Sequence, residues 1–266
     1  MKFLVMTDIE GVTGVTTFRQ AENTEFGRDM LMNDLKAVLA GIKDAGGEAI
    51  VYDMHTDGRN VRLEEIDAPV VMGKPILPYL WRGIGGEGID GLFMVGLHTM
   101  QHEKPIALLQ HSYLREYDAI YINGILLGEI GVEAALAAEA GVPLKFVSGD
   151  DLGCREAEAL GTGVVTCPVK TSLGADTALC LAPSESTVRL REAAKKAALT
   201  TVAPFTVKAP YEIRIQFSDC PYLSKMRELH PEIFADERTA VIKGENLLET
   251  WSRYLLMEKE MVRACQ

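Results

Sequence analysis

KFLVMTDIEG, residues 2–11, places a continuous apolar run directly before two acidic side chains. Such runs, apolar on both faces, are typical of strands inside a parallel sheet. Helical periodicity follows over 21–45 and stops at Gly46-Gly47, and a second apolar run occupies 48–52. Strand, helix and strand in this order predict two parallel neighbours joined by a crossover.

Further segments extend this pattern along the first 200 residues. Apolar runs typical of strands occur at 70–73, 91–96, 143–148 and 163–169, and helical segments at 129–140, 151–160 and 183–200. Asn123-Gly124 within 121–127 is the dipeptide of a two-residue hairpin turn. We therefore expect an α/β fold, a largely parallel sheet with flanking helices.

The sequence changes character after residue 200. Residues 211–217 alternate apolar and polar side chains, as a half-exposed strand does. A further strand is expected over 238–243 and a closing helix over 245–262. We therefore divide the chain into an α/β metal-binding catalytic domain, residues 1–200, and a smaller C-terminal α+β domain, residues 201–266. The sequence assigns no chemical role to the second domain.

The composition is that of an ordinary soluble protein, with 47% apolar and 24% charged residues. The net charge of -11 argues against a nucleic-acid partner, because no basic cluster is present to bind phosphates. No uninterrupted apolar stretch reaches the roughly 20 residues that cross a bilayer, so we expect no membrane partner. Five cysteines without a CxxC spacing indicate free thiols in a reducing compartment, and hence a cytoplasmic protein.

Acidic and histidine side chains recur where the expected strands end. They are Asp8 and Glu10 after the first strand, Asp53 and His55 after the second, and His98 after the strand at 91–96. The carboxyl ends of parallel strands share one edge, and ligands bind there in α/β folds. A sheet needs no charged residues at this edge for stability, so the pattern predicts a functional site.

The triplet Asp8-Ile9-Glu10 is the sharpest element of this pattern. Side chains two apart on an extended segment point to the same side, so both carboxylates face one point. Their repulsion requires a cation or protons. A helix N-cap is the structural alternative and carries equal weight for the triplet alone. The histidines shift the balance, because three of the five lie beside predicted strand ends: His55, His98 and His111.

Four further polar residues have both a functional and a structural interpretation. Glu129 starts a helix, where it adds an acid to the site or suits the helix dipole. Asp150 and Asp151 could both cap the next helix, which is the better explanation for Asp151, and Asp150 is also a candidate for an acidic wall facing a substrate amine. Lys170 either contacts a substrate anion or is a solvated loop residue.

The donor types of this set indicate the metal. Carboxylates with imidazoles, without a thiolate cluster, suit zinc or a similar divalent ion. Two histidines and three carboxylates exceed the three protein ligands of one catalytic zinc. The surplus predicts a two-metal site, with the ions about 3.5–4 Å apart and bridged by a carboxylate and water.

Six short stretches within residues 1–182 combine these residues with neighbouring glycines and serines. They are Thr7-Asp8-Ile9-Glu10-Gly11, Tyr52-Asp53-Met54-His55, Val95-Gly96-Leu97-His98, Gln110-His111-Ser112, Gly128-Glu129-Ile130-Gly131 and Ser148-Gly149-Asp150-Asp151. In this order they resemble the motifs of the DppA-type D-aminopeptidases, a family of cytoplasmic zinc metallopeptidases. The resemblance is weak beyond residue 182.

The resemblance implies a set of site residues and an assembly. Metal ligands would lie at Asp8, Glu10, His55, His98 and Glu129, with Asp8 bridging two zinc ions. His111 would be the catalytic histidine near the reacting carbonyl. The expected assembly is a homodecameric ring whose active sites face an inner channel. One departure is Gly174-Ala175-Asp176, where the family usually has an arginine, so the substrate preference is expected to differ.

We therefore expect a hydrolase, a zinc-dependent aminopeptidase that removes the N-terminal residue of a short peptide. The metals would lower the pKa of bound water toward about 7 and polarise the scissile carbonyl. His111 would move the proton or act as nucleophile. The sequence leaves open whether D- or L-residues are preferred, which side chain is favoured and which metal is physiological.

Two other functions use the same residues. A two-metal phosphoesterase or cyclic-amide hydrolase is the enzymatic alternative, although a phosphoesterase usually adds basic residues at the phosphate. Near these strand ends the sequence offers only Lys104, Arg115 and Lys170. A non-catalytic ring scaffold is the other alternative, and His111 argues against it because the expected metal ions do not need it as a ligand.

Overall fold

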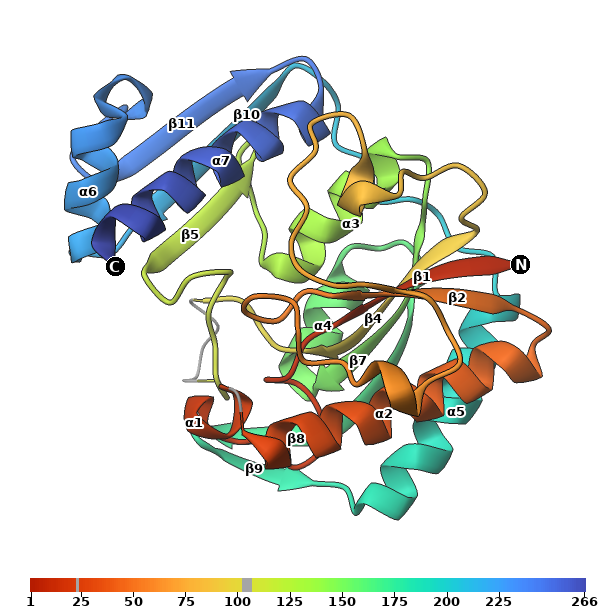
Figure 1. Ribbon diagram of the computed structural model, residues 1–266. Coiled ribbons are helices and arrows are strands. Elements are labelled where there is room, and N and C mark those ends of the chain that lie inside the picture. The colour runs from red at the N-terminus through yellow and green to blue at the C-terminus, as the bar shows by residue number, and fades with distance from the viewer. Residues whose placement is uncertain (23, 102–106) are drawn as a thin grey trace.

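A parallel sheet forms the main layer of the molecule (Figure 1). The computed structural model describes residues 1–22, 24–101 and 107–266, and within them this sheet has seven strands in the order β3-β2-β1-β4-β7-β8-β9. They are β1 (Lys2–Thr7), β2 (Glu48–Asp53), β3 (Val70–Val71), β4 (Gly91–Leu97), β7 (Leu144–Asp150), β8 (Val165–Gly174) and β9 (Thr177–Cys180). Every neighbouring pair is parallel except β8 and β9. The predicted largely parallel sheet is confirmed.

Helices cover both faces of this sheet. One face packs against α2 (Glu25–Asp44) and α5 (Pro183–Leu199), and the other against α3 (Glu129–Glu139) and α4 (Asp151–Ala159). Phe3 and Val5 of β1 face the first pair of helices, whereas Leu4 and Met6 face the second, and all four are fully buried. The apolar run at the start of the chain is therefore continuous because both of its sides are core.

The helix predicted over 21–45 begins later than expected, at Glu25, and a separate short helix, α1 (Phe18–Ala21), precedes it. Thr24 caps α2 by accepting a hydrogen bond from the Gly27 backbone N–H at 3.1 Å. The hydroxyl of Thr24 satisfies a donor that the first helical turn leaves free.

A second, antiparallel sheet lies beside the first. The described part of the chain gives it four strands in the order β11-β10-β5-β6. They are β5 (Tyr117–Ile122), β6 (Ile125–Leu126), β10 (Tyr211–Phe217) and β11 (Thr239–Gly244). The expected hairpin turn joins β5 to β6, with φ of 51° at Asn123 and 79° at Gly124, the positive values of a type I′ turn.

Two helices complete this second layer, α6 (Pro221–Leu229) and α7 (Leu247–Cys265). A common core joins the layers, since apolar residues of β1, α3, β5, β10 and α7 pack in one cluster. The strands β5 and β6 precede residue 200, yet they belong to the same sheet as the C-terminal strands. The division of the chain at residue 200 stays a prediction. Within the described ranges, no helix combines the length and apolar character needed to cross a membrane.

Candidate metal centre

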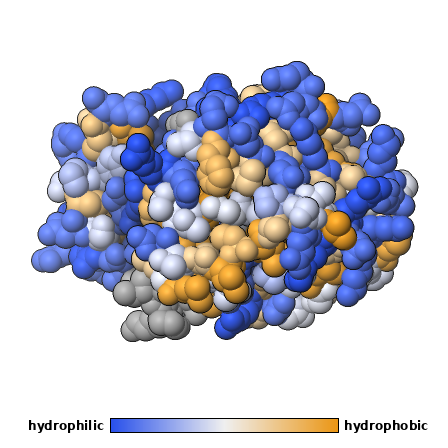
Figure 2. All heavy atoms as spheres, turned by 90° about the horizontal axis from the view of Figure 1, so that it is seen from below, coloured by the Kyte–Doolittle hydropathy of each residue, from blue (hydrophilic) through white to orange (hydrophobic). Residues whose placement is uncertain are grey.

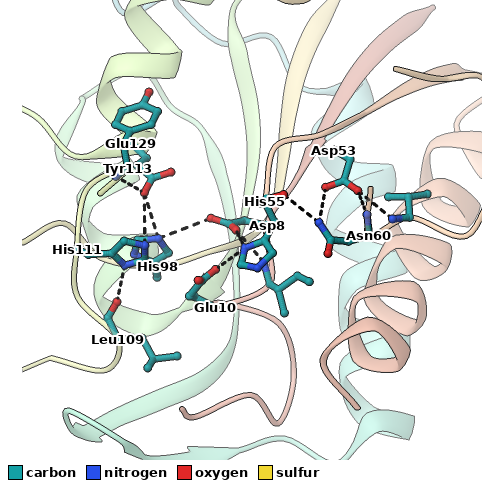
Figure 3. Close-up of polar contacts among 12 residues, drawn as sticks. Asp8, Glu10, Asp53, His55, Asn60, His98, Leu109, His111, Tyr113 and Glu129 are labelled. Atoms are coloured by element: carbon teal, nitrogen blue, oxygen red, sulfur yellow. Dashed lines mark hydrogen bonds and ion pairs between the residues drawn. The ribbon is translucent and has the colours of Figure 1, made fainter. Parts of the chain in front are cut away.

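The predicted ligands come together at the carboxyl edge of the parallel sheet (Figure 3). Asp8 and Glu10 follow β1, His55 follows β2, His98 follows β4, and Glu129 is the first residue of α3. All five side chains are buried. Parallel neighbours deliver these residues to one edge because their strands end at the same level.

Asp8 occupies the middle of the cluster. Its Oδ1 lies 2.9 Å from Nδ1 of His55, and its Oδ2 lies 3.6 Å from Nε2 of His98. Nδ1 of His55 also lies 3.1 Å from Oε2 of Glu10. The two carboxylates of the Asp8-Ile9-Glu10 triplet therefore face one imidazole, as the spacing predicts.

Glu129 forms the other half of the cluster. Its Oε1 lies 3.4 Å from Nε2 of His98 and 3.9 Å from Nε2 of His111, and it accepts a hydrogen bond from the Tyr113 backbone N–H at 2.7 Å. The rings of His98 and His111 stack in parallel, with centroids 4.0 Å apart. His111, the histidine of the Gln110-His111-Ser112 stretch, thus lies in the cluster.

Backbone carbonyls fix the orientation of both stacked imidazoles. Nδ1 of His98 lies 3.0 Å from the carbonyl oxygen of Thr99, and Nδ1 of His111 lies 2.9 Å from that of Leu109. A carbonyl only accepts, so each Nδ1 carries a proton and Nε2 is the ring nitrogen that faces the cluster. This arrangement is typical of metal-ligating histidines.

The electrostatics of the cluster favour bound positive charge. Burial alone would raise the pKa of Asp8, but His55 and His98 overcome it and hold that pKa below the usual range. Burial opposes protonation of His55, yet Glu10 and Asp8 raise its pKa to about 11, and Glu129 and Asp8 likewise raise the pKa of His98 to about 10. The buried carboxylates thus require cations close by, and divalent metal ions meet this requirement.

The donor atoms form two overlapping groups suited to a divalent ion. Among the residues that the structure describes, each group has three metal-type donor atoms that lie within 4.8 Å of one another. One group is Asp8, Glu10 and His98, and the other is His98, His111 and Glu129. His98 belongs to both groups, whereas His55 belongs to neither and contacts Asp8 and Glu10 directly.

A buried lysine supports the loop after β1. Nζ of Lys170 donates to the backbone carbonyl oxygens of Glu10, Val12 and Val15, the second at 3.0 Å. Lys170 is 2% exposed, and burial lowers its pKa to about 8. Both interpretations drawn from the sequence, an anion contact and a solvated loop residue, are therefore wrong, since the ammonium group binds backbone oxygens and holds the segment that carries Glu10.

Glycines allow the strand ends to approach closely. A Cβ atom on Gly11 or on Gly149 would lie 1.8 Å from the carbonyl oxygen of Leu97. Gly96 has a φ of +79°, and its Cβ would lie 2.3 Å from the carbonyl oxygen of Asp8. Side chains at these positions would force β1, β4 and β7 apart.

Two acids that the sequence placed near the site have structural roles. Asp53 accepts hydrogen bonds from the Val61 backbone N–H at 2.9 Å and from Asn60 Nδ2 at 3.2 Å, and so shapes the loop after β2. Asp150 caps α4 by accepting from the backbone N–H groups of Leu152 and Gly153, both at 2.9 Å. Of the two residues expected as possible caps, Asp150 is the cap, and the preference for Asp151 as the cap and the amine-binding role of Asp150 are wrong.

A cavity of about 660 Å³ opens onto the cluster. Asp8, Glu10, His55, His111 and Glu129 line one side, and Glu258 of α7 lies among the residues of the other. Arg82 and Glu133, which the sequence interpretation missed, also line it, with Arg82 Nε 3.1 Å from Glu133 Oε2. Glu133 lies four residues after Glu129 on α3, a spacing that places both carboxylates on the same helix face.

The basic residues considered for a phosphate lie elsewhere or are paired. Arg115 lines the cavity and lies 3.1 Å from a carboxylate oxygen of Glu22. Lys170 is buried behind the cluster. Lys104 falls outside the described residues.

Comparisons with known proteins agree with this geometry. Residues 1–255 match the family model described as D-aminopeptidase, Peptidase_M55. A D-aminopeptidase of Bacillus subtilis (strain 168) is 27% identical, over 99% of this chain and 98% of the relative. Among solved structures, the Zn-dependent D-aminopeptidase DppA from Bacillus subtilis, described as a self-compartmentalizing protease, superposes with a TM-score of 0.89. That pair is 25% identical, over 99% of this chain and 98% of the other.

These matches extend the likeness well past residue 182, where the motifs become weak. They confirm the predicted family and the expected class of enzyme, a metal-dependent aminopeptidase. The chain belongs to the D-aminopeptidase family.

Proposed function

We propose that this protein is a zinc-dependent aminopeptidase that holds two zinc ions per subunit and removes the N-terminal residue of short peptides. The observation that carries the proposal is the convergence of side chains from β1, β2, β4 and α3 beside the cavity. The proposed ligands are Asp8, Glu10, His55, His98 and Glu129. A relative described as Zn-dependent supports the choice of metal.

The chain's own groups position the substrate and move the proton. Zinc bound at this centre would polarise the scissile carbonyl and lower the pKa of water. His111 lines the cavity, whereas the cavity wall leaves out His98, so His111 is the imidazole that a substrate would meet. Its proton on Nδ1 is held by the Leu109 carbonyl, which leaves Nε2 to take up a proton or attack the carbonyl.

The protonation state of His111 agrees with this role. Burial lowers the pKa of His111 below its ordinary value, which favours the neutral ring. A neutral imidazole accepts a proton in one step and returns it to the leaving amine in the next.

Two of the three basic residues noted in the sequence are engaged by the protein itself, since Arg115 is paired with Glu22 and Lys170 binds backbone oxygens. Lys74, Lys259 and Arg263 also line the cavity, so a phosphate ester belongs in the substrate panel as the enzymatic alternative. A scaffold without catalysis would have no use for an oriented histidine on the cavity wall, and His111 occupies that position.

We propose that the substrates carry a D-residue at the N-terminus, because the matched relatives are described as D-aminopeptidases. The segment that lacks the usual arginine is close to the catalytic histidine, since the Ala175 carbonyl accepts a hydrogen bond from the Leu109 N–H at 3.0 Å. Leu109 in turn orients His111. A shifted side-chain preference is therefore expected from this segment.

We propose a ring-shaped decamer with active sites facing an inner channel. A relative described as self-compartmentalizing supports an assembly of this kind. Figure 2 shows apolar side chains gathered on the face at the end of the molecule that carries β8 and β9. Leu173 and Leu179 of these strands are 65% and 68% exposed, as expected of residues that a neighbouring subunit covers.

The five cysteines, all within the described ranges, carry no disulfide, which agrees with the proposed cytoplasmic location.

Metal analysis combined with a stereochemical substrate panel tests the proposal. We expect two zinc ions per chain, cleavage of D-Ala-D-Ala in preference to L-Ala-L-Ala, loss of activity with EDTA and recovery on adding zinc. A phosphate monoester and a cyclic amide serve as control substrates. Full peptidase activity after metal removal, or faster turnover of either control substrate, would contradict the proposal. Light scattering on the eluting protein measures the number of subunits.

A further inference from the structure

Helix α7 places a carboxylate in the cavity, although no chemical role was expected for the C-terminal segment. Glu258 lines the cavity together with Leu255 and Val262 of the same helix. The proposed metal ligands line the same cavity and Glu258 is not among them. The helix crosses the second sheet (Figure 1), so this carboxylate comes from the layer that lacks the metal centre.

A chain of hydroxyl groups holds this carboxylate in place. The hydroxyl of Tyr254 donates to that of Tyr117, and Tyr117 donates to Oε2 of Glu258 at 2.6 Å. Both tyrosines are fully buried. Two fixed hydroxyls in series polarise each other and orient Glu258 without neutralising its charge.

Glu258 also differs in charge balance from other acids of the cavity. Glu22 lies 3.1 Å from an Arg115 nitrogen, Asp57 lies 3.2 Å from an Arg59 nitrogen, and Glu133 is paired with Arg82. Within the described parts of the chain, Glu258 accepts a hydrogen bond from the Tyr117 hydroxyl and has no ion-pair partner within 4.0 Å, although Lys74 and Lys259 line the same cavity. Its carboxylate is therefore available to a cation that enters the cavity.

Glu258 and the proposed ligand Glu129 line the same cavity of about 660 Å³. Burial raises the pKa of Glu258, and the Tyr117 hydroxyl and the charge of Lys74 oppose the shift.

Aromatic contacts link the two carboxylates through the protein as well. Tyr113, whose N–H binds Glu129, packs on Trp251 with ring centroids 5.2 Å apart, and Trp251 packs on Tyr254 at 5.7 Å. Trp251, Tyr254 and Glu258 recur at helical spacing, so one face of α7 is turned toward the centre.

We propose that Glu258 binds the ammonium group of the substrate and so determines which peptides are accepted. This inference rests on the proposed aminopeptidase function. An ammonium group that leaves water for a partly buried cavity needs an anionic partner, and a charge-assisted hydrogen bond to a fixed carboxylate supplies one. The group is the α-ammonium that every aminopeptidase substrate carries, and a lysine side chain presents the same chemistry.

Substitution of the carboxylate by its amide tests the inference in the zinc-loaded protein. Glu258→Gln keeps an acceptor for Tyr117, and Glu260→Gln is the matched control on the outward side of α7, where Glu260 lies near His230. The substrates are D-alanine p-nitroanilide and its α-hydroxy analogue, D-lactic acid p-nitroanilide. We expect Glu258→Gln to raise KM for the amine about tenfold or more, with a smaller change in kcat, and to leave the hydroxy analogue unchanged.

A second pair of substrates separates the two sources of an ammonium group. If Glu258 binds a side-chain ammonium, Glu258→Gln will reduce the preference for lysine p-nitroanilide over norleucine p-nitroanilide. It will then change KM for the alanine and lactic acid substrates to the same small extent. An equal effect on all substrates, or no effect on any, would overturn the inference. Zinc content and melting temperature of the variant should match those of the parent protein.

A binding measurement keeps this inference separate from the proposed function. Calorimetry of D-alaninamide and D-lactamide with the zinc-loaded protein needs no turnover. We expect alaninamide to bind more tightly, and Glu258→Gln to remove that difference while Glu260→Gln keeps it. If the protein binds alaninamide through Glu258 yet cleaves no peptide, the aminopeptidase proposal fails and the ammonium site stands. If it cleaves peptides and the binding difference survives in Glu258→Gln, the ammonium site fails alone.

Discussion

The two sheets contribute to one cavity in different ways. In the parallel sheet, β1, β2 and β4 end side by side, and the residue or two after each strand carries an acid or an imidazole. The antiparallel sheet has no common carboxyl edge, and its layer lines the cavity with side chains of α7 such as Glu258, which the buried Tyr117 of β5 holds in place. Parallel pairing therefore concentrates chemistry at strand ends, whereas the antiparallel layer supplies a wall whose polar groups come from positions without a shared sequence signal.

The largest expected effect comes from removing a ligand at the parallel edge. His98→Ala deletes the imidazole that belongs to both donor groups, so we expect loss of bound zinc and of peptidase activity to background. Metal analysis and dipeptide hydrolysis measure the two losses. Glu260→Gln on the antiparallel side is the control. Retention of both zinc ions and of turnover in His98→Ala would break the comparison, because the parallel edge would then not be the centre.

The second-largest effect is expected from His111→Ala, which should lower catalysis without removing zinc. We expect His111→Ala to lower kcat by about 10²-fold or more, because the group that moves the proton is lost. The zinc content should stay close to that of the parent protein, since the proposed ligands remain. Loss of one zinc ion from His111→Ala would instead identify His111 as a ligand, which its 3.9 Å distance from Glu129 allows.

Lys170, which binds the loop after β1, is expected to contribute to the stability of the folded protein. Lys170→Met removes the donors to the carbonyls of Glu10, Val12 and Val15, and leaves buried oxygens unpaired. We expect the free energy of unfolding to fall by about 3 kcal/mol, measured by denaturant titration at pH 7. An exposed lysine such as Lys195 changed to Met should cost little. A loss as small in Lys170→Met would show that the loop holds without the lysine.

The pH dependence of the same pair of proteins sharpens this prediction. The folded-state pKa of Lys170, about 8, lies below its ordinary value of 10.5, so between these values the unfolded chain binds more protons than the folded one. Stability from this group therefore rises with pH across that window, by at most about 3 kcal/mol. We expect the difference between parent protein and Lys170→Met to widen from pH 8 to 10.5. A constant difference would contradict the shifted pKa.

The smallest effect is expected on the antiparallel side. Tyr117→Phe removes the hydroxyl between Tyr254 and Glu258, so the free energy of unfolding should fall by about 1 kcal/mol. KM for an amine substrate should rise less than in Glu258→Gln, because the carboxylate stays and loses only its support. A larger KM effect in Tyr117→Phe than in Glu258→Gln would mean that the hydroxyl, not the carboxylate, contacts the substrate.

Local sequence was enough to predict the parallel sheet and the convergence at its edge. The positions of Asp8, Glu10, His55 and His98 follow from strand ends, because β2 and β4 both pair in parallel with β1 and all three end at the same edge. The pairing of β5 with β10 joins segments that are far apart in the sequence, 117–122 and 211–217. The residue pattern of a strand predicts that it is a strand but not which other strand it pairs with.

Side-chain roles were harder to predict than strand positions. Asp53, Asp150 and Lys170 lie in or beside the motifs, yet the side chain of each forms hydrogen bonds with nearby backbone groups and does not face the cavity. Which carboxylate binds a loop and which faces a cavity depends on a few ångströms of packing that residue spacing does not contain. Glu258 shows the converse, since its helix position carries no motif at all.

The crowding around the Leu97 carbonyl has a consequence for recognising relatives of this protein. Gly11, in the turn after β1, and Gly149 of β7 both lie against that one oxygen, and Gly96 packs on the Asp8 carbonyl in a backbone conformation that other residues rarely adopt. These constraints are steric and would persist in a descendant that had exchanged its zinc ligands for other residues. The three glycines should therefore outlast the catalytic apparatus in evolution, and would reveal inactive descendants that a search for histidines and acids alone would overlook.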